Sequence, residues 1–254
     1  MQTLPPLPQF AAGNSPPERA SAIWHPSPNC GERRGGARPD LIVIHFTAMA
    51  SATAALHRLC QPAAEVSAHY LIDARGMLVQ MVPEALRAWH AGAGAWGPVR
   101  DVNSRSIGIE LANDGRSPFP EPQMRALVDL IAGIRARWHI PPARVIGHSD
   151  MAPGRKVDPG PRFDWRRLAR QGQAVWPDVA AVSAPGAAPP VAEARFAAAC
   201  TAVGYPADVA PDVCLAAFRL RFRPWARGAL DAQDVAVAEA VARAFPVDRG
   251  APTA

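Results

Sequence analysis

A loop in the second half of the chain carries three residue types that can do chemistry together. His148, Lys156 and Asp158 lie within eleven positions of one another, in the stretch IGHSDMAPGRKVDPGP. We predict a loop rather than a helix here, because proline and glycine interrupt helical backbone. An imidazole and a carboxylate on one ordered loop suit one side of a metal site. A further ligand is then expected from another part of the chain.

His45 is the expected further ligand. It ends a run of apolar residues, 41–44, that is typical of a buried strand. Sheets of α/β proteins place their chemistry at the carboxyl ends of the strands, which is where His45 stands. Two histidines and one carboxylate form a ligand set that zinc enzymes use, with a fourth position left for water. The sequence therefore predicts one Zn²⁺ per chain, bound by His45, His148 and Asp158.

Lys156 is unusual because it is the only lysine in a chain that has 27 basic residues. Lysine and arginine differ in shape and in how readily they lose a proton. A compact point charge in a tight site is one reason to keep a lysine two residues before a metal ligand. Chance placement is the alternative.

Glu110 lies inside an apolar run of a predicted strand that covers residues 103–113. Burying a carboxylate is unfavourable unless it is paired or lies near a cation. Water activated at a metal site would be one such partner. A salt bridge to an arginine is the alternative.

Two other segments could contribute to a groove. Residues 88–96 contain Trp89, His90 and two glycines, which suit a groove for a sugar or a peptide; a loop plugged into the core by its tryptophans is the alternative. Residues 66–73 and 77–82 predict a β-hairpin. His69 and Tyr70 alternate along its first strand, so only one of them can face the site.

The remaining patterns complete an α/β chain. Apolar spacing predicts helices over residues 49–59, 122–138, from 163 onward, 196–203, 211–221 and 231–244. We predict four segments: an N-terminal arm, 1–22; an α/β domain, 23–179; an uncharged linker rich in Ala, Pro, Ser and Gly, 180–190; and a small three-helix binding module, 191–254.

Composition narrows the partners. Of the 254 residues, 20 basic and 15 acidic ones precede position 189 and seven of each follow it, so the net charge of +5 belongs to the first part. A basic domain suits an anionic substrate, whereas the lack of an arginine cluster with interleaved aromatic residues argues against nucleic acid. The four cysteines form no C-x-x-C pair, and their redox state stays open.

No transmembrane segment and no signal peptide are seen in the sequence. We therefore expect a cytoplasmic protein. The alternative is a periplasmic or cell-envelope location, if a leader is missing.

Six motifs, in order, resemble one family. Within residues 24–176 they read IVIHFTA, SAHYLID, AWHAG, NSRSIGIEL, IGHSDMAPGRKVDPGP and FDW. This set resembles the zinc-dependent N-acetylmuramoyl-L-alanine amidases of the type-2 amidase family, whose fold is shared by animal peptidoglycan-recognition proteins. Residues 191–248, with GYP, AFRLRFRP and GALDAQ, resemble the helical peptidoglycan-binding module that follows some of these amidases.

The resemblance implies a mixed central β-sheet flanked by helices, with zinc in a surface groove. It implies that His45, His148 and Asp158 bind zinc, that Glu110 is the general base, and that Lys156 stabilises the oxyanion. It places Tyr70 where some relatives have a catalytic tyrosine, and Trp89, His90 and Arg105 in segments that line the substrate groove.

The implied reaction is hydrolysis of the amide bond between N-acetylmuramic acid, or its 1,6-anhydro form, and L-alanine, in peptidoglycan or in a soluble muropeptide. The alternative is a non-catalytic peptidoglycan-recognition protein, which would lack one or more metal ligands.

Overall fold

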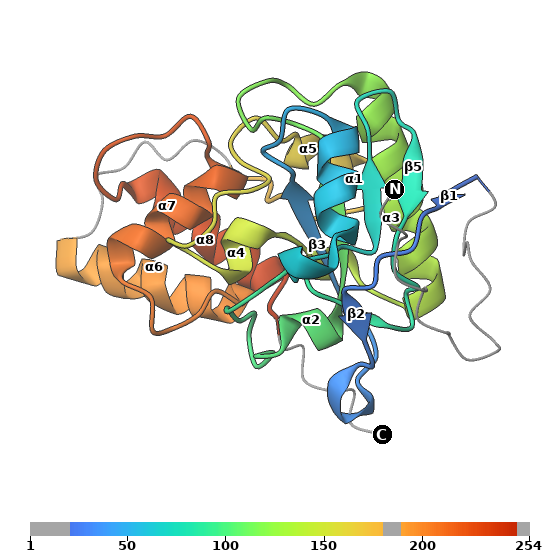
Figure 1. Ribbon diagram of the computed structural model, residues 1–254. Helices are drawn as coiled ribbons and strands as arrows, with labels where there is room; N and C mark the ends of the chain where they lie inside the picture. The colour runs from blue at the N-terminus through green and yellow to red at the C-terminus, as the bar shows by residue number, and fades with distance from the viewer. Residues whose placement is uncertain (1–20, 180–188, 248–254) are drawn as a thin grey trace, which may run out of the picture.

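The computed structural model describes residues 21–179 and 189–247, which are built around one mixed six-stranded sheet (Figure 1). The strand order is β1-β5-β4-β7-β3-β8. The strands are β1 (Ile23–Trp24), β3 (Leu41–Phe46), β4 (Tyr70–Ile72), β5 (Leu78–Gln80), β7 (Ser106–Leu111) and β8 (Val145–Gly147). Neighbouring strands are parallel, except that β5 is antiparallel to β4. The predicted mixed sheet is therefore confirmed. A separate two-stranded sheet pairs β2 (Cys30–Gly31) with β6 (Arg87–Ala88).

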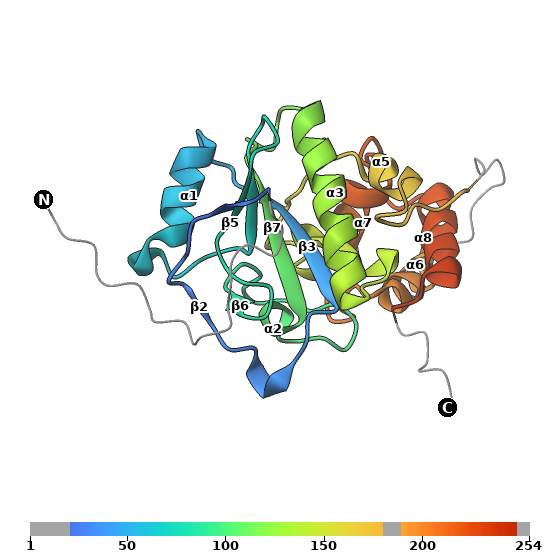
Figure 2. The same cartoon turned by 90° about the vertical axis from the view of Figure 1, so that its right-hand side faces the viewer.

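Alternation along β3 divides the core into two sides. Ile42 and Ile44 pack on one side with helix α3 (Glu121–Trp138), which lies along β3 and β7 in Figure 2. Leu41 and Val43 pack on the other side. His45 follows the same alternation and joins Leu41 and Val43. We call the sheet face that carries Leu41, Val43 and His45 the site face.

Shorter helices and turns complete the fold. Helix α1 (Ala52–Cys60) packs against the β4–β5 part of the site face, where Leu71 and Val79 are buried. The other elements are α2 (Val102–Arg105), α4 (His148–Met151), α5 (Trp165–Arg170) and the 3₁₀ turns Arg34–Gly36, Pro62–Ala64 and Pro142–Arg144.

Two of these short helices correct the predictions. The strand expected from residue 103 begins at Ser106, because the Asp101 side chain accepts a hydrogen bond from the Ser104 N–H and caps α2 instead. Residues 148–151 form a helical turn where we expected loop. The prolines of this stretch begin only at Pro153, so they do not interrupt that turn.

The three predicted C-terminal helices are present as α6 (Pro189–Val203), α7 (Pro211–Phe222) and α8 (Ala232–Ala244). Their buried side chains share one apolar core with the site face of the sheet, and Phe218 and Val241 of these helices belong to the same cluster as Val43 and Ile146. They thus form a covering layer of the sheet, which differs from a module attached only through a linker (Figure 1).

Residues 1–20 of the predicted arm (1–22) and residues 180–188 of the predicted linker (180–190) lie outside the described residues. Within the described part, no helix has the length and the apolar character needed to cross a membrane.

Candidate metal centre

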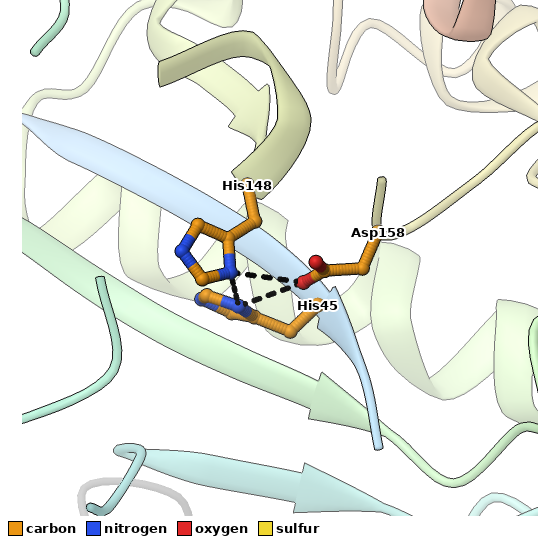
Figure 3. Close-up of side chains that lie close together, drawn as sticks. All are labelled: His45, His148 and Asp158. Atoms are coloured by element: carbon orange, nitrogen blue, oxygen red, sulfur yellow. Dashed lines mark hydrogen bonds and ion pairs between the residues drawn. The ribbon is translucent and has the colours of Figure 1, made fainter. Parts of the chain in front are cut away.

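The three predicted metal ligands come together at the carboxyl end of the sheet (Figure 3). His45 is near the end of β3, His148 opens α4, and Asp158 lies in the loop that follows. The Nδ1 atoms of the two histidines are 2.9 Å apart, and each lies 3.1 Å from Oδ2 of Asp158. All three residues are buried.

The hydrogen bonds of His148 determine which of its nitrogens carries a proton. Its Nε2 lies 2.8 Å from the Ala91 carbonyl oxygen. A carbonyl oxygen only accepts, so Nε2 must donate. In neutral His148 the lone pair therefore belongs to Nδ1, which faces His45 and Asp158.

A directional chain of hydrogen bonds determines which nitrogen of His45 carries the proton. The Ser106 hydroxyl donates to the Val102 carbonyl at 2.6 Å, so it accepts from Nε2 of His90 at 3.1 Å. His90 then presents an unprotonated Nδ1, which accepts from Nε2 of His45 at 3.0 Å. The lone pair of His45 is left on Nδ1, beside that of His148. His90 thus orients a candidate ligand, although we expected it only to line the groove.

The protonation states favour a cation at this point. Burial lowers the pKa of His45 to about 4 and that of His90 well below its usual value, so both are neutral near pH 7. Burial acts to raise the pKa of Asp158, but hydrogen bonds with His148 and His45 hold it well below the usual value. Two imidazole lone pairs and a carboxylate oxygen at this spacing repel one another unless they share a cation. The donor set is one that zinc takes in catalytic sites.

Glu110 lies beside this cluster. It is the Cα partner of His45 on the neighbouring parallel strand β7. Its Oε2 atom is buried and has no hydrogen-bond partner among the described residues, so the alternative of an arginine salt bridge is not found there. Burial, and secondarily Asp158, raise the pKa of Glu110 to about 8, against a smaller opposing effect of Lys156.

The cluster opens into a cleft of about 430 Å³. Its lining includes the three candidate ligands together with Phe46, Thr47, Met49, Arg58, Val66, Ser67, Trp89, His90, Glu110, Arg155, Lys156 and Val157. Lys156 is half-buried in the cleft wall, and its backbone N–H donates to Ala152 at 3.0 Å. Nη2 of Arg155 donates to the carbonyl oxygens of Ala91 and Ala93, which ties the tryptophan loop to the ligand loop.

Two expected groove residues lie elsewhere. Tyr70 is the Cα partner of Ile109, one residue before Glu110, so its side chain points to the opposite sheet face and its hydroxyl donates to Oε1 of Glu84 at 2.7 Å. Arg105 precedes β7, at the amino ends of the strands, and its Nε donates to Oδ1 of Asp40 at 3.0 Å. The cleft lies at the other ends of these strands, so the expectation that these two residues line it is corrected.

Ser106 and Arg155 take part in the site but were not predicted. Ser106 could have been found, because it lies four residues before Glu110 in the same strand and so on the same face. The role of Arg155 depends on contacts with a loop 62 and 64 residues away in the chain, and nothing in the local sequence signals it.

Comparison with known proteins decides the family. The profile of the family Amidase_2, described as N-acetylmuramoyl-L-alanine amidase, matches residues 35–161, which contain all of the candidate ligands. The chain belongs to this amidase family.

The relatives differ in how much of the chain they match. The N-acetylmuramoyl-L-alanine amidase AmiD of Escherichia coli (strain K12) is 39% identical, over 83% of this chain and 85% of its own length. The 1,6-anhydro-N-acetylmuramyl-L-alanine amidase AmpD of Enterobacter cloacae is 42% identical, over 41% of this chain and 55% of its own length.

Solved structures of the family are similar to most of this chain. The complex of E. coli AmiD with anhydro-N-acetylmuramic acid-L-Ala-D-gamma-Glu-L-Lys superposes with a TM-score of 0.73 at 34% identity, over 87% of this chain and 99% of that one. AmpDh3 of Pseudomonas aeruginosa with an anhydromuramic pentapeptide has a TM-score of 0.70 at 30% identity, over 84% and 95%. A match to 87% of the chain must extend past residue 189, so this amidase architecture includes C-terminal helices.

Proposed function

We propose that this amidase hydrolyses the bond between N-acetylmuramic acid, or its 1,6-anhydro form, and L-alanine, using one zinc ion held by His45, His148 and Asp158. The observation that carries the proposal is the convergence of two Nδ1 lone pairs and one carboxylate oxygen within 3.1 Å, next to Glu110, which is half-buried and whose Oε2 atom is buried. When bound, zinc acts as a Lewis acid that polarises a carbonyl group and lowers the pKa of water.

Glu110 is the proposed general base. In the metal-free protein burial raises the pKa of Glu110 to about 8; a bound cation would favour its ionised form, and a carboxylate whose pKa lies near the working pH is suited to accept a proton and to return it. Its Oε2, which has no hydrogen-bond partner among the described residues, would take a proton from the attacking water and return it to the amine of L-alanine as that amine leaves. One residue then serves as base and as acid in sequence.

Lys156 is the proposed cation for the oxyanion that forms at the scissile carbonyl. It lines the cleft with Glu110 and the ligands, and the described residues form no ion pair with its ammonium group. A preorganised positive charge in a partly dry cleft stabilises developing negative charge more than it stabilises the neutral substrate.

The charge of the cleft supports a muropeptide substrate. Its cations are Arg58, Arg155 and Lys156, of which Arg58 is exposed and forms no ion pair with described residues. Peptides of the kind bound to the AmiD structure carry carboxylate groups, which guanidinium groups recognise. Trp89, half-buried in the lining, offers an apolar surface for a sugar ring.

The test separates an enzyme from a receptor. Zinc-loaded protein is incubated with 1,6-anhydro-N-acetylmuramyl-L-Ala-γ-D-Glu-L-Lys, and the products are identified by mass spectrometry, with Asp158→Ala as the control. We expect release of a peptide with a free L-alanine amine, by the unmodified protein only. Binding of the muropeptide by zinc-loaded protein without cleavage would instead support the non-catalytic recognition protein.

We further propose that the C-terminal helices hold the enzyme on polymeric peptidoglycan. The support is Trp225 in the α7–α8 connection, 62% exposed between Arg223 and Arg227, since an exposed indole can stack on sugar rings. Trp225→Ala should weaken sedimentation with isolated sacculi while hydrolysis of the soluble muropeptide is unchanged. Equal sedimentation of both proteins would contradict this role.

A further inference from the structure

Asp150 connects the C-terminal helices to the helix that carries a candidate ligand. It lies two residues after His148 in α4 and is fully buried. Its Oδ2 accepts the Gly147 N–H at 2.8 Å and Nη1 of Arg221 at 2.9 Å, and its Oδ1 accepts the Tyr205 hydroxyl at 2.6 Å. Two of these three donors come from the C-terminal helical layer, 55 and 71 residues further along the chain.

Arg221 of α7 holds both sides of the turn from which His148 projects. Its Nη2 donates to the Val145 carbonyl of β8 at 3.2 Å, while its Nη1 reaches Asp150 of α4. Its side chain is 2% exposed, and its guanidinium carbon lies 4.4 Å from the ring centroid of Trp165. A buried planar group with this many partners has little freedom to move.

Tyr205 reaches the second support of His148, the loop whose Ala91 carbonyl fixes its tautomer. The Tyr205 ring packs edge-on against Trp96, with centroids 5.3 Å apart. The neighbouring Gly204 accepts the Gly97 N–H at 2.7 Å, and a Cβ at Gly204 would lie 2.5 Å from the Trp96 ring, so only glycine allows this contact. One C-terminal segment therefore contacts both α4 and the loop.

We infer that Arg221 and Tyr205 are positioning residues of the metal centre. They act through Asp150 and Trp96, and they hold Nδ1 of His148 toward His45 and Asp158. The C-terminal helices are on this account part of the catalytic scaffold, in addition to any binding of polymer. The inference rests on the proposed zinc site.

The chain contains a matched control for this inference. Arg219 lies two residues earlier on the same helix and is also buried. Its partners are the Asp234 carboxylate and the carbonyl oxygens of Gly228 and Ala229, all within the C-terminal layer. Replacing Arg219 removes a comparable buried ion pair without touching α4 or the loop.

The experiment compares Arg221→Met, Tyr205→Phe and Arg219→Met in the full chain. Zinc affinity is measured by competition with a chelator, and amide hydrogen exchange of residues 148–152 is measured in the metal-free proteins. We expect zinc affinity to fall ten- to a hundredfold in Arg221→Met, the usual range for losing an orienting partner of a ligand. Tyr205→Phe should lower zinc affinity by a smaller factor. In both variants the amide hydrogens of residues 148–152 should exchange faster than in the unmodified protein. Arg219→Met should melt at a lower temperature yet keep unmodified zinc affinity and exchange.

Equal zinc affinities for Arg221→Met and Arg219→Met would overturn the inference, because the C-terminal layer would then contribute stability alone. If Arg221→Met does not fold, Tyr205→Phe decides, since it removes one hydroxyl; unchanged affinity and exchange in it would overturn the inference. Failure of the unmodified chain to bind zinc would count against the proposed function instead.

Discussion

His45 and Glu110 are Cα partners on the neighbouring parallel strands β3 and β7. Because side chains at paired positions emerge on the same face, this register alone places a candidate ligand beside the candidate general base. A slip of one residue would turn Glu110 to the α3 side of the sheet, where Ile109 now lies. The long apolar runs on both strands, buried on both faces, make such a slip unfavourable.

Removal of any one ligand should abolish metal binding and activity together. His45→Ala, His148→Ala and Asp158→Ala each leave two protein ligands, too few to hold zinc against dialysis. Elemental analysis of the dialysed proteins checks this, with His57→Ala as the control because His57 is exposed on α1. Full zinc content in one of the three variants would show that its residue is not a ligand.

Glu110→Gln should keep zinc and fold but lose turnover. The amide has nearly the shape of the carboxyl group but cannot accept the proton, and loss of a general base typically costs about a hundredfold or more in rate. The measurement is kcat on the soluble muropeptide at saturating zinc. A kcat equal to that of the unmodified protein would remove Glu110 from the mechanism.

The same substitution should change how stability depends on pH. The pKa of Glu110 is raised from 4.5 to about 8, so across this window the folded metal-free protein holds a proton that the unfolded chain releases. The contribution of Glu110 to stability therefore falls as pH rises from about 5 to about 8, whereas buried His45 and His90, whose pKa values are lowered, contribute in the opposite direction. In urea unfolding of the metal-free proteins, the difference in unfolding free energy between the unmodified chain and Glu110→Gln should therefore shift in favour of Glu110→Gln across this window. Parallel pH profiles would contradict the raised pKa.

Lys156→Arg should reduce kcat at least tenfold although it preserves charge. Lys156 lies two residues before Asp158, and its bond to Ala152 fixes its backbone. A guanidinium is wider and planar, and it would pair with Asp158 or Glu110 instead of reaching the carbonyl oxygen. Loss of one oxyanion donor typically lowers kcat about a hundred- to a thousandfold, and a misplaced donor should cause part of that loss. The measurement is kcat beside zinc content and melting temperature, which we expect to be little changed. An unchanged kcat would make the single lysine an accident of composition.

The convergence of the three candidate ligands could be predicted because its signals are local. His45 ends an apolar strand, and the spacing from His148 to Asp158 belongs to one proline-ordered loop. Glu110 could be predicted for the same reason, because it is an acidic residue inside an apolar run. Each needs only strand alternation and the position of strand ends to be placed.

Tyr70 and Arg105 show where this reasoning stops. Sequence alternation tells that His69 and Tyr70 face opposite sides, but only the pairing of Tyr70 with Ile109 decides which side faces the cleft. Arg105 lies directly before β7, the strand that carries Glu110, and so at the amino end of that strand, next to Asp40. The contact between Asp150 and Arg221 joins residues 71 positions apart, so no local pattern reveals it.

One titration tests the central claim most directly. Metal-free protein receives zinc in fractions of an equivalent, and release of the L-alanine peptide from the muropeptide is followed at each step. We predict no hydrolysis without metal, and a rise that stops at one equivalent of zinc per chain. Full hydrolysis by the metal-free protein, or no hydrolysis once one equivalent is bound, would contradict the account.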